Sequence, residues 1–294
     1  MHRLLSYTAL TALVVLLASP GVTAQKTQQI FLKATGANGA PIPDIKASEV
    51  SVSEDGVACK VLKVELAGSA KVQLLVDNGA VNTTPINGLR DGLQGFFEKL
   101  PDGVDVSVYT TAPQSRPIVK NMTDKKKLVD SIAIITPDRG AGLFFESLLD
   151  AVDRVDRDKA PGLPVIVVVG SDVGTEEIKQ RDVLDIQQKI IKNHIRIDVV
   201  LMQGGRNASS RSGVQPEIGM TVTKLSGGRY EFINSTTRLA TLLPEIGGRL
   251  AEAASGQGIQ YRVTYEGASK RSASPKVSVS VAREATVTTS FDGH

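Results

Sequence analysis

The chain has 294 residues, of which 41% are hydrophobic and 22% are charged. This length predicts one large domain or two ordinary ones, and the composition excludes a disordered or low-complexity chain. The chain has 34 Lys and Arg against 31 Asp and Glu. Residues 1–24, which are expected to be removed as a leader, contain one of these cations, Arg3, so the remaining chain has a net charge of about +2. This balance excludes a strong electrostatic preference for nucleic acid or an anionic membrane.

Residues 1–24 have the three parts of a secretory signal peptide. Arg3 gives a positively charged start, and Leu10 to Ala18 form a short apolar segment. The small-residue stretch Val22-Thr23-Ala24 then provides a cleavage signal. Because the apolar segment is short for a membrane span, an uncleaved anchor is the weaker alternative. We therefore expect a secreted or periplasmic protein with no membrane span after cleavage.

Residues 25–69 are predicted to form strands only. The expected strands are Gln29 to Lys33, Glu49 to Ser53 and Val57 to Leu66, with a hairpin signal at Glu54-Asp55-Gly56. The last strand carries Cys59, the single cysteine of the chain, which excludes an internal disulfide framework. Free cysteine is usually buried, so we expect it to pack on the strand; the alternative is a reactive thiol.

The stretch from Lys71 to Asn82 begins a different pattern. Its apolar residues, Val72 and Leu74 to Val76, stop at Asp77 and at the turn-forming pair Asn78-Gly79. A short apolar run bounded by turn residues indicates a strand buried on both faces, as in parallel sheets covered by helices. Ligands of such sheets bind at the carboxyl ends of the strands, which is where Asp77 is expected.

Strands and helices alternate from residue 70 to residue 256. The further strands are expected at Val104 to Thr110, Pro164 to Val169, Ile195 to Met202 and Arg229 to Ile233. The helices are expected after Thr84-Pro85, over Asp124 to Ile134, over Phe144 to Val155, from Thr175-Glu176-Glu177, over Val214 to Ser226 and over Leu239 to Ala254. Pro244 is expected to begin the main segment of the last helix, because proline breaks the hydrogen-bond ladder elsewhere. The alternation predicts a mostly parallel sheet with helices on both faces.

From Ile259 onward the pattern returns to strands. Tyr261 to Tyr265 alternates, as do Val277, Val279 and Val281. Each strand-only flank is too short to bury a core of its own, so the flanks are expected to pair. The predicted organisation is a signal peptide, an N-terminal β segment, an α/β domain and a C-terminal β segment, over residues 1–24, 25–69, 70–256 and 257–294. The α/β domain is thus predicted to be inserted in a small β-sandwich formed by 25–69 and 257–294.

Asp77 and Asp172 end the two most apolar strands. If these strands are neighbours, the two carboxylates converge at one point of the sheet edge. Hard divalent cations prefer such oxygen ligands, so one hypothesis is a Mg²⁺ or Ca²⁺ site. The alternative is that each acid caps a helix or a turn.

Five stretches, taken in order, match motifs of one known family. They are Val50 to Val61 (VSVSEDGVACKV), Val72 to Asp77, Ser147 to Val152 (SLLDAV), Val165 to Asp172, and Leu243 to Tyr265 ending in IQYRVTY. Together with the order of elements from 70 to 256, they resemble a von Willebrand factor type A domain of the bacterial secreted group called VWFA-related. The resemblance spans nearly all of the chain after the leader, and it implies a Rossmann-like α/β fold.

The resemblance also implies a metal-ion-dependent adhesion site. The family uses an Asp-x-Ser-x-Ser loop after the first strand, a Thr before the third helix and an Asp after the fourth strand. Asp77 and Asp172 match the two acids, whereas Gly79 and Val81 stand where the family has serines. Glycine and valine offer no side-chain oxygen, so the implied site is degenerate.

The threonine position of the family falls near Glu146, or on Ser147 if the alignment shifts by one residue. Glu146 would add a third carboxylate to Asp77 and Asp172. The resemblance therefore names these three acids as the candidate ligands of a degenerate Mg²⁺ or Ca²⁺ site, and it implies no other cofactor.

The sequence does not favour an enzyme. His2 lies in the leader, His194 precedes a strand and is expected away from the site edge, and His294 ends the chain. The chain has no Gly-x-Ser-x-Gly, His-Glu-x-x-His or phosphate-loop motif. We therefore predict an exported, non-catalytic protein–protein interaction or adhesion-type module, without a conventional metal site. The alternatives are a metal-dependent hydrolase that uses the three acids and a purely structural envelope component.

Binding is expected at the loops of the carboxyl edge, and the partner is expected to be an unidentified protein rather than nucleic acid. These loops are Asp77 to Asn82, Gly140 to Glu146, Ser171 to Thr175 and Gly204 to Gly213. The candidate contact residues within or beside them are Asn78, Gly79, Ser171 and Arg206. The assignment follows from the rule for parallel sheets together with the family resemblance.

Overall fold

The computed structural model describes most of the chain from residue 27 onward. The described residues are 27–79, 86–158, 162–174, 176–204, 214–255, 260–268 and 275–290. The predicted signal peptide, the predicted helix start at Thr84-Pro85 and the loop residue Arg206 lie outside these ranges. Among the described residues, no helix is both long and apolar enough to cross a membrane.

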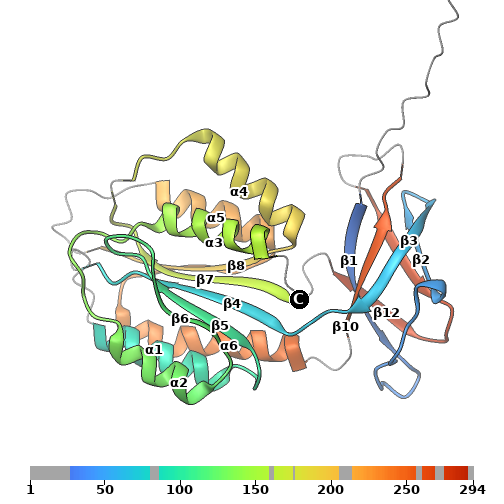
Figure 1. The fold of residues 1–294 in the computed structure, drawn as a ribbon, viewed down its shortest axis with the longest axis horizontal. Coiled ribbons are helices and arrows are strands. Elements are labelled where there is room, and N and C mark those ends of the chain that lie inside the picture. Colours follow the sequence, from blue (N-terminus) through green and yellow to red (C-terminus); the bar gives the residue numbers. More distant parts are fainter. Residues whose placement is uncertain are drawn as a thin grey trace, which may run out of the picture.

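One six-stranded sheet forms the centre of the α/β part (Figure 1). In pairing order its strands are β6 (Arg116–Met122), β5 (Asp105–Thr110), β4 (Ala70–Val76), β7 (Leu163–Ser171), β8 (Arg196–Met202) and β9 (Tyr230–Ile233). All neighbours run parallel except β5 and β6. The predicted α/β fold with a mostly parallel sheet is therefore confirmed.

Helices cover both faces of this sheet, as Figure 1 shows. One face carries α1 (Ile86–Lys99), α2 (Lys125–Ser131) and α6 (Leu239–Ser255). The other carries α3 (Phe144–Asp158), α4 (Gln180–Asn193) and α5 (Val214–Ser226). Short 3-10 turns lie at Ala47–Glu49, Ile132–Ile134 and Thr236–Arg238. The antiparallel edge strand β6 was not predicted, because it includes Pro117 and Lys120 and shows no buried residue.

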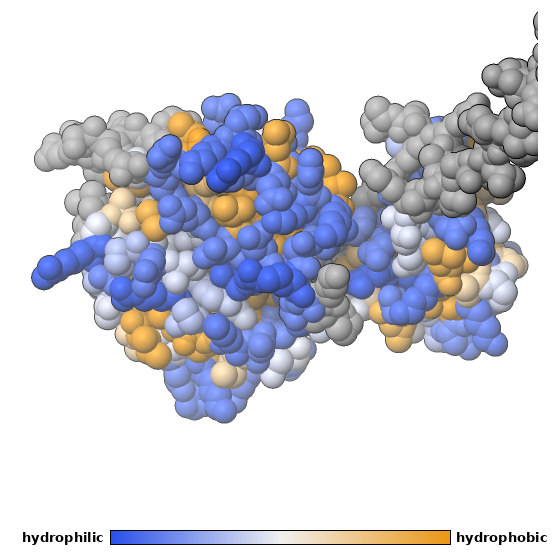
Figure 2. Space-filling model, turned by 45° about the horizontal axis from the view of Figure 1, so that its top comes forward, coloured by the Kyte–Doolittle hydropathy of each residue, from blue (hydrophilic) through white to orange (hydrophobic). Residues whose placement is uncertain are grey.

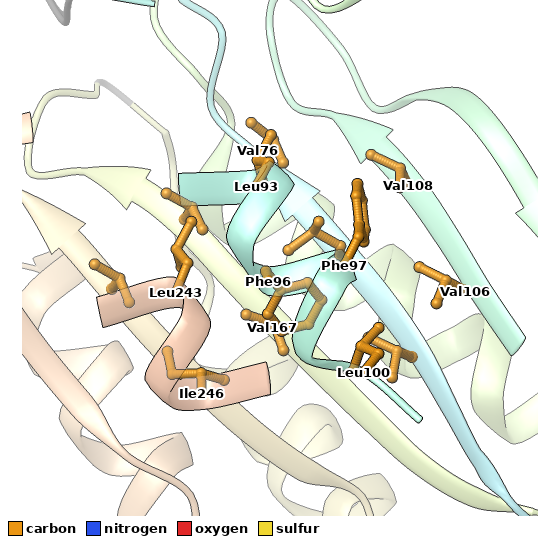
Figure 3. Packing of buried hydrophobic residues seen from close by; sticks show 14 of the residues in the cluster. Val76, Leu93, Phe96, Phe97, Leu100, Val106, Val108, Val167, Leu243 and Ile246 are labelled. Carbon is orange, nitrogen blue, oxygen red and sulfur yellow. The ribbon is translucent and has the colours of Figure 1, made fainter. Parts of the chain in front are cut away.

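The larger core lies between the sheet and the helices α1 and α6. Figure 3 shows Phe96 and Phe97 of α1 lying among valines of the sheet and Leu243 of α6. Both phenylalanines are fully buried, and their rings meet edge to face with centroids 5.7 Å apart. Burial of one such side chain stabilises the fold by about 1.5–3 kcal/mol, so this layer fixes the positions of the strand ends.

Helices α1 and α6 approach each other closely through glycine. A Cβ placed at Gly92 would lie 2.7 Å from the carbonyl oxygen of Leu239, and one at Gly95 would lie 2.5 Å from Cγ of Pro244. Pro244 lies inside α6 and does not begin its main segment, so that prediction was wrong. The missing N–H removes one helix hydrogen bond, but the ring packs on the space that Gly95 leaves.

The two flanks pair with each other in a second, antiparallel sheet, as predicted (Figure 1). Its pairing order is β11 (Val277–Val281), β2 (Val50–Glu54), β3 (Val57–Leu66), β10 (Gln260–Glu266), β1 (Thr27–Thr35) and β12 (Thr286–Ser290). The first part of β3 pairs with β2 and the rest pairs with β10. Strands β11 and β12 follow one another in the chain but lie at opposite ends of the pairing order, so the sheet must fold over on itself.

The folded antiparallel sheet encloses a core of its own. Val50 and Val52 of β2 lie in one cluster with Val263 and Tyr265 of β10. Cys59 is half-buried against this cluster, in agreement with a packing role. Pairing of the two flanks thus supplies the core that neither flank has alone.

A buried acid at the hairpin signal generates a test of this second core. Glu54 is 1% exposed, and its carboxylate accepts hydrogen bonds from the Tyr265 hydroxyl (3.0 Å) and the Ala268 N–H (2.9 Å). Tyr265→Phe removes one donor from a buried acceptor, so we expect a loss of about 1–3 kcal/mol in the free energy of unfolding. Chemical denaturation measures it. Tyr230→Phe, at a half-buried tyrosine on β9, is the control, and equal stability of the two variants would contradict this role of Glu54.

Candidate functional site

Strand pairing brings the two predicted acids to one edge of the α/β sheet. β4 and β7 run parallel with Val76 opposite Val169, and the N–H of Asp77 donates to the Val169 carbonyl (2.8 Å). The N–H of Asp172 donates to the Met202 carbonyl at the end of β8 (3.0 Å). The carboxyl ends of three neighbouring strands therefore meet here, as expected for this class of sheet.

The carboxylate of Asp77 is bound by the protein itself. Its Oδ1 accepts from the Gly79 N–H (2.8 Å), and its Oδ2 accepts from the Ser171 hydroxyl (2.9 Å). The side chain is 5% exposed. Gly142, in the loop before α3, lies directly against it, because a Cβ at that position would be 2.3 Å from Cγ of Asp77. Backbone thus covers the predicted metal-ligating oxygens.

Asn78 and Gly79 tie the neighbouring loops together. The Asn78 amide donates to the Thr136 carbonyl (2.8 Å), and its oxygen accepts from the Ala112 N–H (3.2 Å). Gly79 forms a parallel bridge with Asp138. Because Asn78 is 7% exposed, it positions the loops rather than presenting a side chain at the surface.

Asp172 has a similar internal role. Its Oδ1 accepts from the Gly204 N–H (2.5 Å), and the side chain is 7% exposed. The hydrogen bond holds the first residues after β8 against the end of β7. Burial, together with the charge of Asp172, raises the pKa of Tyr230 above its usual value.

Glu146 does not join the two aspartates. It is exposed in the first turn of α3, and the same turn receives the carboxylate of Glu176, which accepts from the N–H groups of Phe145 (3.1 Å) and Glu146 (2.9 Å). Burial raises the pKa of Glu176. A carboxylate is favourable at this positive end of a helix.

Glu176 was expected to open the following helix, and that prediction was wrong. α4 begins at Gln180 with Lys179 as its N-cap. The carboxylate of Glu176 instead binds the start of α3, where it accepts from the N–H of Phe145, a residue 31 positions earlier in the chain. Sequence spacing gives no signal for such a long-range cap, because it depends on how α3 and the loop after β7 pack together.

Two buried hydroxyls near the edge make no hydrogen bond to the described residues. Ser147, the alternative match to the family threonine, is 0% exposed, and its Oγ has no such partner. The Oγ of Thr111, which follows β5, is in the same state. Neither position was named as a primary ligand from the sequence.

The structure does not bring together the three acids that the family resemblance names. Within the described ranges, no three Asp, Glu, His or Cys side chains come together in a group able to hold a metal ion. Asp77 and Ser171 are brought together, whereas Glu146 stays apart and Arg206 lies outside the described residues. Metal binding by the three acids, and the hydrolase alternative that needs them, remain predictions from sequence.

The contact between Gly142 and Asp77 generates a direct test of this closed arrangement. Gly142→Ala places a methyl group inside the carboxylate, so the loop must move, and such overpacking costs about 1–3 kcal/mol. We expect a lower midpoint of chemical denaturation. Gly248→Ala on α6 is the matched control, since a Cβ there meets nothing within 4 Å. A Gly142→Ala variant as stable as the wild type would show that the loop does not rest on Asp77.

Comparisons with known proteins support the fold only. No protein-family model and no curated protein matches the chain. Among solved structures, it is similar to a von Willebrand factor type A protein from Catenulispora acidiphila (11% identity, TM-score 0.52), over 90% of this chain and 72% of that chain. It is also similar to BatB from Bacteroides thetaiotaomicron (11% identity, TM-score 0.47), over 63% of this chain and 100% of that chain. A further similar structure is proximal thread matrix protein 1 from the mussel byssus (13% identity, TM-score 0.47), over 64% of this chain and 48% of that chain. The α/β part has the fold of a von Willebrand factor type A domain.

Proposed function

We propose that the protein is an exported, non-catalytic module that binds another protein through the loops at the carboxyl edge of its α/β sheet, without a conventional metal site. The fold is one that commonly serves interaction and adhesion, although fold alone does not fix function. Export follows from the signal peptide predicted at residues 1–24. The observation that carries the proposal is the internal use of the Asp77 carboxylate.

An adhesion site of the usual kind needs its first aspartate free to receive an ion. Here both oxygens of Asp77 accept protein hydrogen bonds, and Gly142 lies against the carboxylate. Affinity for hard cations depends on the number and charge of oxygen ligands. Because Glu146 does not supply a third carboxylate beside Asp172, the edge is better suited to direct contact with a partner than to contact through an ion.

The same hydrogen bonds give the edge a fixed shape. Arg116 at the start of β6 binds Asp138 (3.3 Å), and Asp138 accepts from the Arg139 N–H (2.7 Å). Exposed side chains then project from different loops, including those of Arg139 and Gln203. A surface held in place before binding loses less conformational entropy when a partner docks, and loops on a rigid scaffold are the usual location of such surfaces.

Site-specific crosslinking in the exporting cell tests the proposal. A photoreactive amino acid placed at Arg139 or at Gln203 should capture one protein partner, and the yield should be the same after chelation of divalent ions with EDTA. Lys63, exposed on β3 of the antiparallel sheet, is the control position and should capture nothing. Capture at Lys63 alone would place the binding surface elsewhere, and loss of capture in EDTA would show that an ion is required.

A further inference from the structure

A cavity of about 660 Å³ lies where the α/β part meets the antiparallel sheet. On one side it runs along β5 from Asp105 to Tyr109 and past Lys71 at the start of β4. On the other side Phe31 of β1 and Arg262 of β10 close it. Small-molecule sites commonly have this volume. The cavity reaches the amino-terminal ends of the parallel strands, whereas the Asp77 site lies at their carboxyl ends.

The sheet wall of the cavity is polar. Alternate residues of a strand share one face, so Gln73 of β4 and Ser107 of β5 lie on the same face as Leu75 and Tyr109, which pack toward α3. The strand that was predicted to be buried on both faces is therefore apolar on this face only at Leu75. Figure 2 shows that the visible face of the α/β part is mostly hydrophilic, with scattered hydrophobic residues.

Cationic side chains predominate in the lining. They are Lys71, Lys120, Arg154, Arg157, Lys192 and Arg262, against the acids Asp105 and Asp158. Both acids form ion pairs with Lys71, whose Nζ lies 3.8 Å from Oδ2 of Asp105 and 3.2 Å from Oδ2 of Asp158. Within the described part of the chain, no carboxylate forms an ion pair with the three arginines or with Lys120. Lys192 pairs with Asp156 outside the lining (2.7 Å). The remaining excess of positive charge favours ligands of the opposite sign.

The guanidinium group of Arg154 is held in position by Tyr109 and Gln73, and one of its N–H donor groups has no hydrogen-bond partner among the described residues. Its guanidinium carbon lies 3.9 Å from the centroid of the Tyr109 ring, and its Nε donates to Oε1 of Gln73 (2.8 Å). Its Nη2 is buried and makes no hydrogen bond to the described residues. Burial lowers the pKa of Arg154, because burial disfavours the charged form of a side chain. An oxyanion beside this group would satisfy both its charge and its free donor.

Arg262, on the other side of the junction, likewise lies near an aromatic ring and has one donor without a partner among the described residues. Its Nη2 donates to the Gly162 carbonyl (2.7 Å), and its guanidinium carbon lies 5.7 Å from the centroid of the Phe31 ring. Its Nε is buried without a hydrogen-bond partner among the described residues. Phe31 in turn meets the ring of His194 edge to face at 5.7 Å. Two guanidinium groups from different parts of the fold thus line one cavity.

We propose that this junction cavity, defined by the lining above, binds a small organic phosphate through the guanidinium groups of Arg154 and Arg262. The planar, multidonor guanidinium matches phosphate oxygens, and the volume exceeds that of a phosphate ion, which leaves room for an organic body. Lys120 and Arg157 add positive charge to the lining. Because the ligand contacts both parts of the fold, it stabilises their junction. The proposal is independent of protein binding at the opposite edge.

Calorimetry on the full mature chain at low salt tests the proposal with two phosphate esters of different shape, glucose 6-phosphate and adenosine monophosphate. Glucose, inorganic phosphate and succinate are the comparison probes. We expect saturable binding of at least one ester, weaker competing binding of inorganic phosphate, and none of glucose. Arg154→Gln and Arg262→Gln should each weaken ester binding by about tenfold or more, as expected for loss of a charged hydrogen bond. Arg181→Gln, at an exposed arginine outside the lining, should leave it unchanged.

Thermal melts separate this effect from misfolding. The bound ester should raise the melting temperature of the wild type and of Arg181→Gln but not that of Arg154→Gln. If Arg154→Gln does not fold, Arg262→Gln decides the question. Absence of ester binding, tighter binding of succinate, or equal weakening by Arg181→Gln would overturn the proposal. If inorganic phosphate binds but neither ester does, the proposal that the ligand is an organic phosphate is wrong.

Discussion

The parallel pairing of β4 with β7 is the constraint on which the rest of the structure depends. Its register sets Val76 opposite Val169, and so it places Asp77 within hydrogen-bonding distance of Ser171. The buried phenylalanines of α1 pack against one face of these strands (Figure 3). Because α1 also lies close against α6, this packing fixes the position of the strands. A one-residue shift in register would turn every side chain to the other face and would separate the two groups.

Closure of the carboxyl edge follows from that pairing. With Ser171 on one oxygen and Gly79 on the other, the Asp77 carboxylate has become a structural acceptor, and Gly142 lies over it. Asp172 and Glu176 likewise hold backbone N–H groups at neighbouring loop and helix starts. The acids that resemble a metal site therefore hold loops and helix starts in place in this structure.

The sequence predicted the architecture better than the site. Alternating patterns and short apolar runs report local burial, so the parallel sheet, the pairing of the flanks and the location of Asp77 and Asp172 at one edge were all predictable. Contacts between distant segments were not. The cap that Glu176 provides for α3, the cover of Gly142 over Asp77 and the stacking of Arg154 on Tyr109 depend on three-dimensional packing, and no spacing rule encodes them.

Titration of a chain that lacks residues 1–24 with Mg²⁺, Ca²⁺ and Mn²⁺ by calorimetry tests the central claim most directly, with Asp77→Asn as the comparison. Extracellular calcium modules bind with dissociation constants of about 10⁻⁴–10⁻³ M, so ion concentrations that extend above this range are required. The account predicts no saturable heat from the wild type at these concentrations. Saturable binding that disappears in Asp77→Asn would contradict it, because the Asp77 carboxylate would then receive an ion as well as, or in place of, its hydrogen bonds from Gly79 and Ser171.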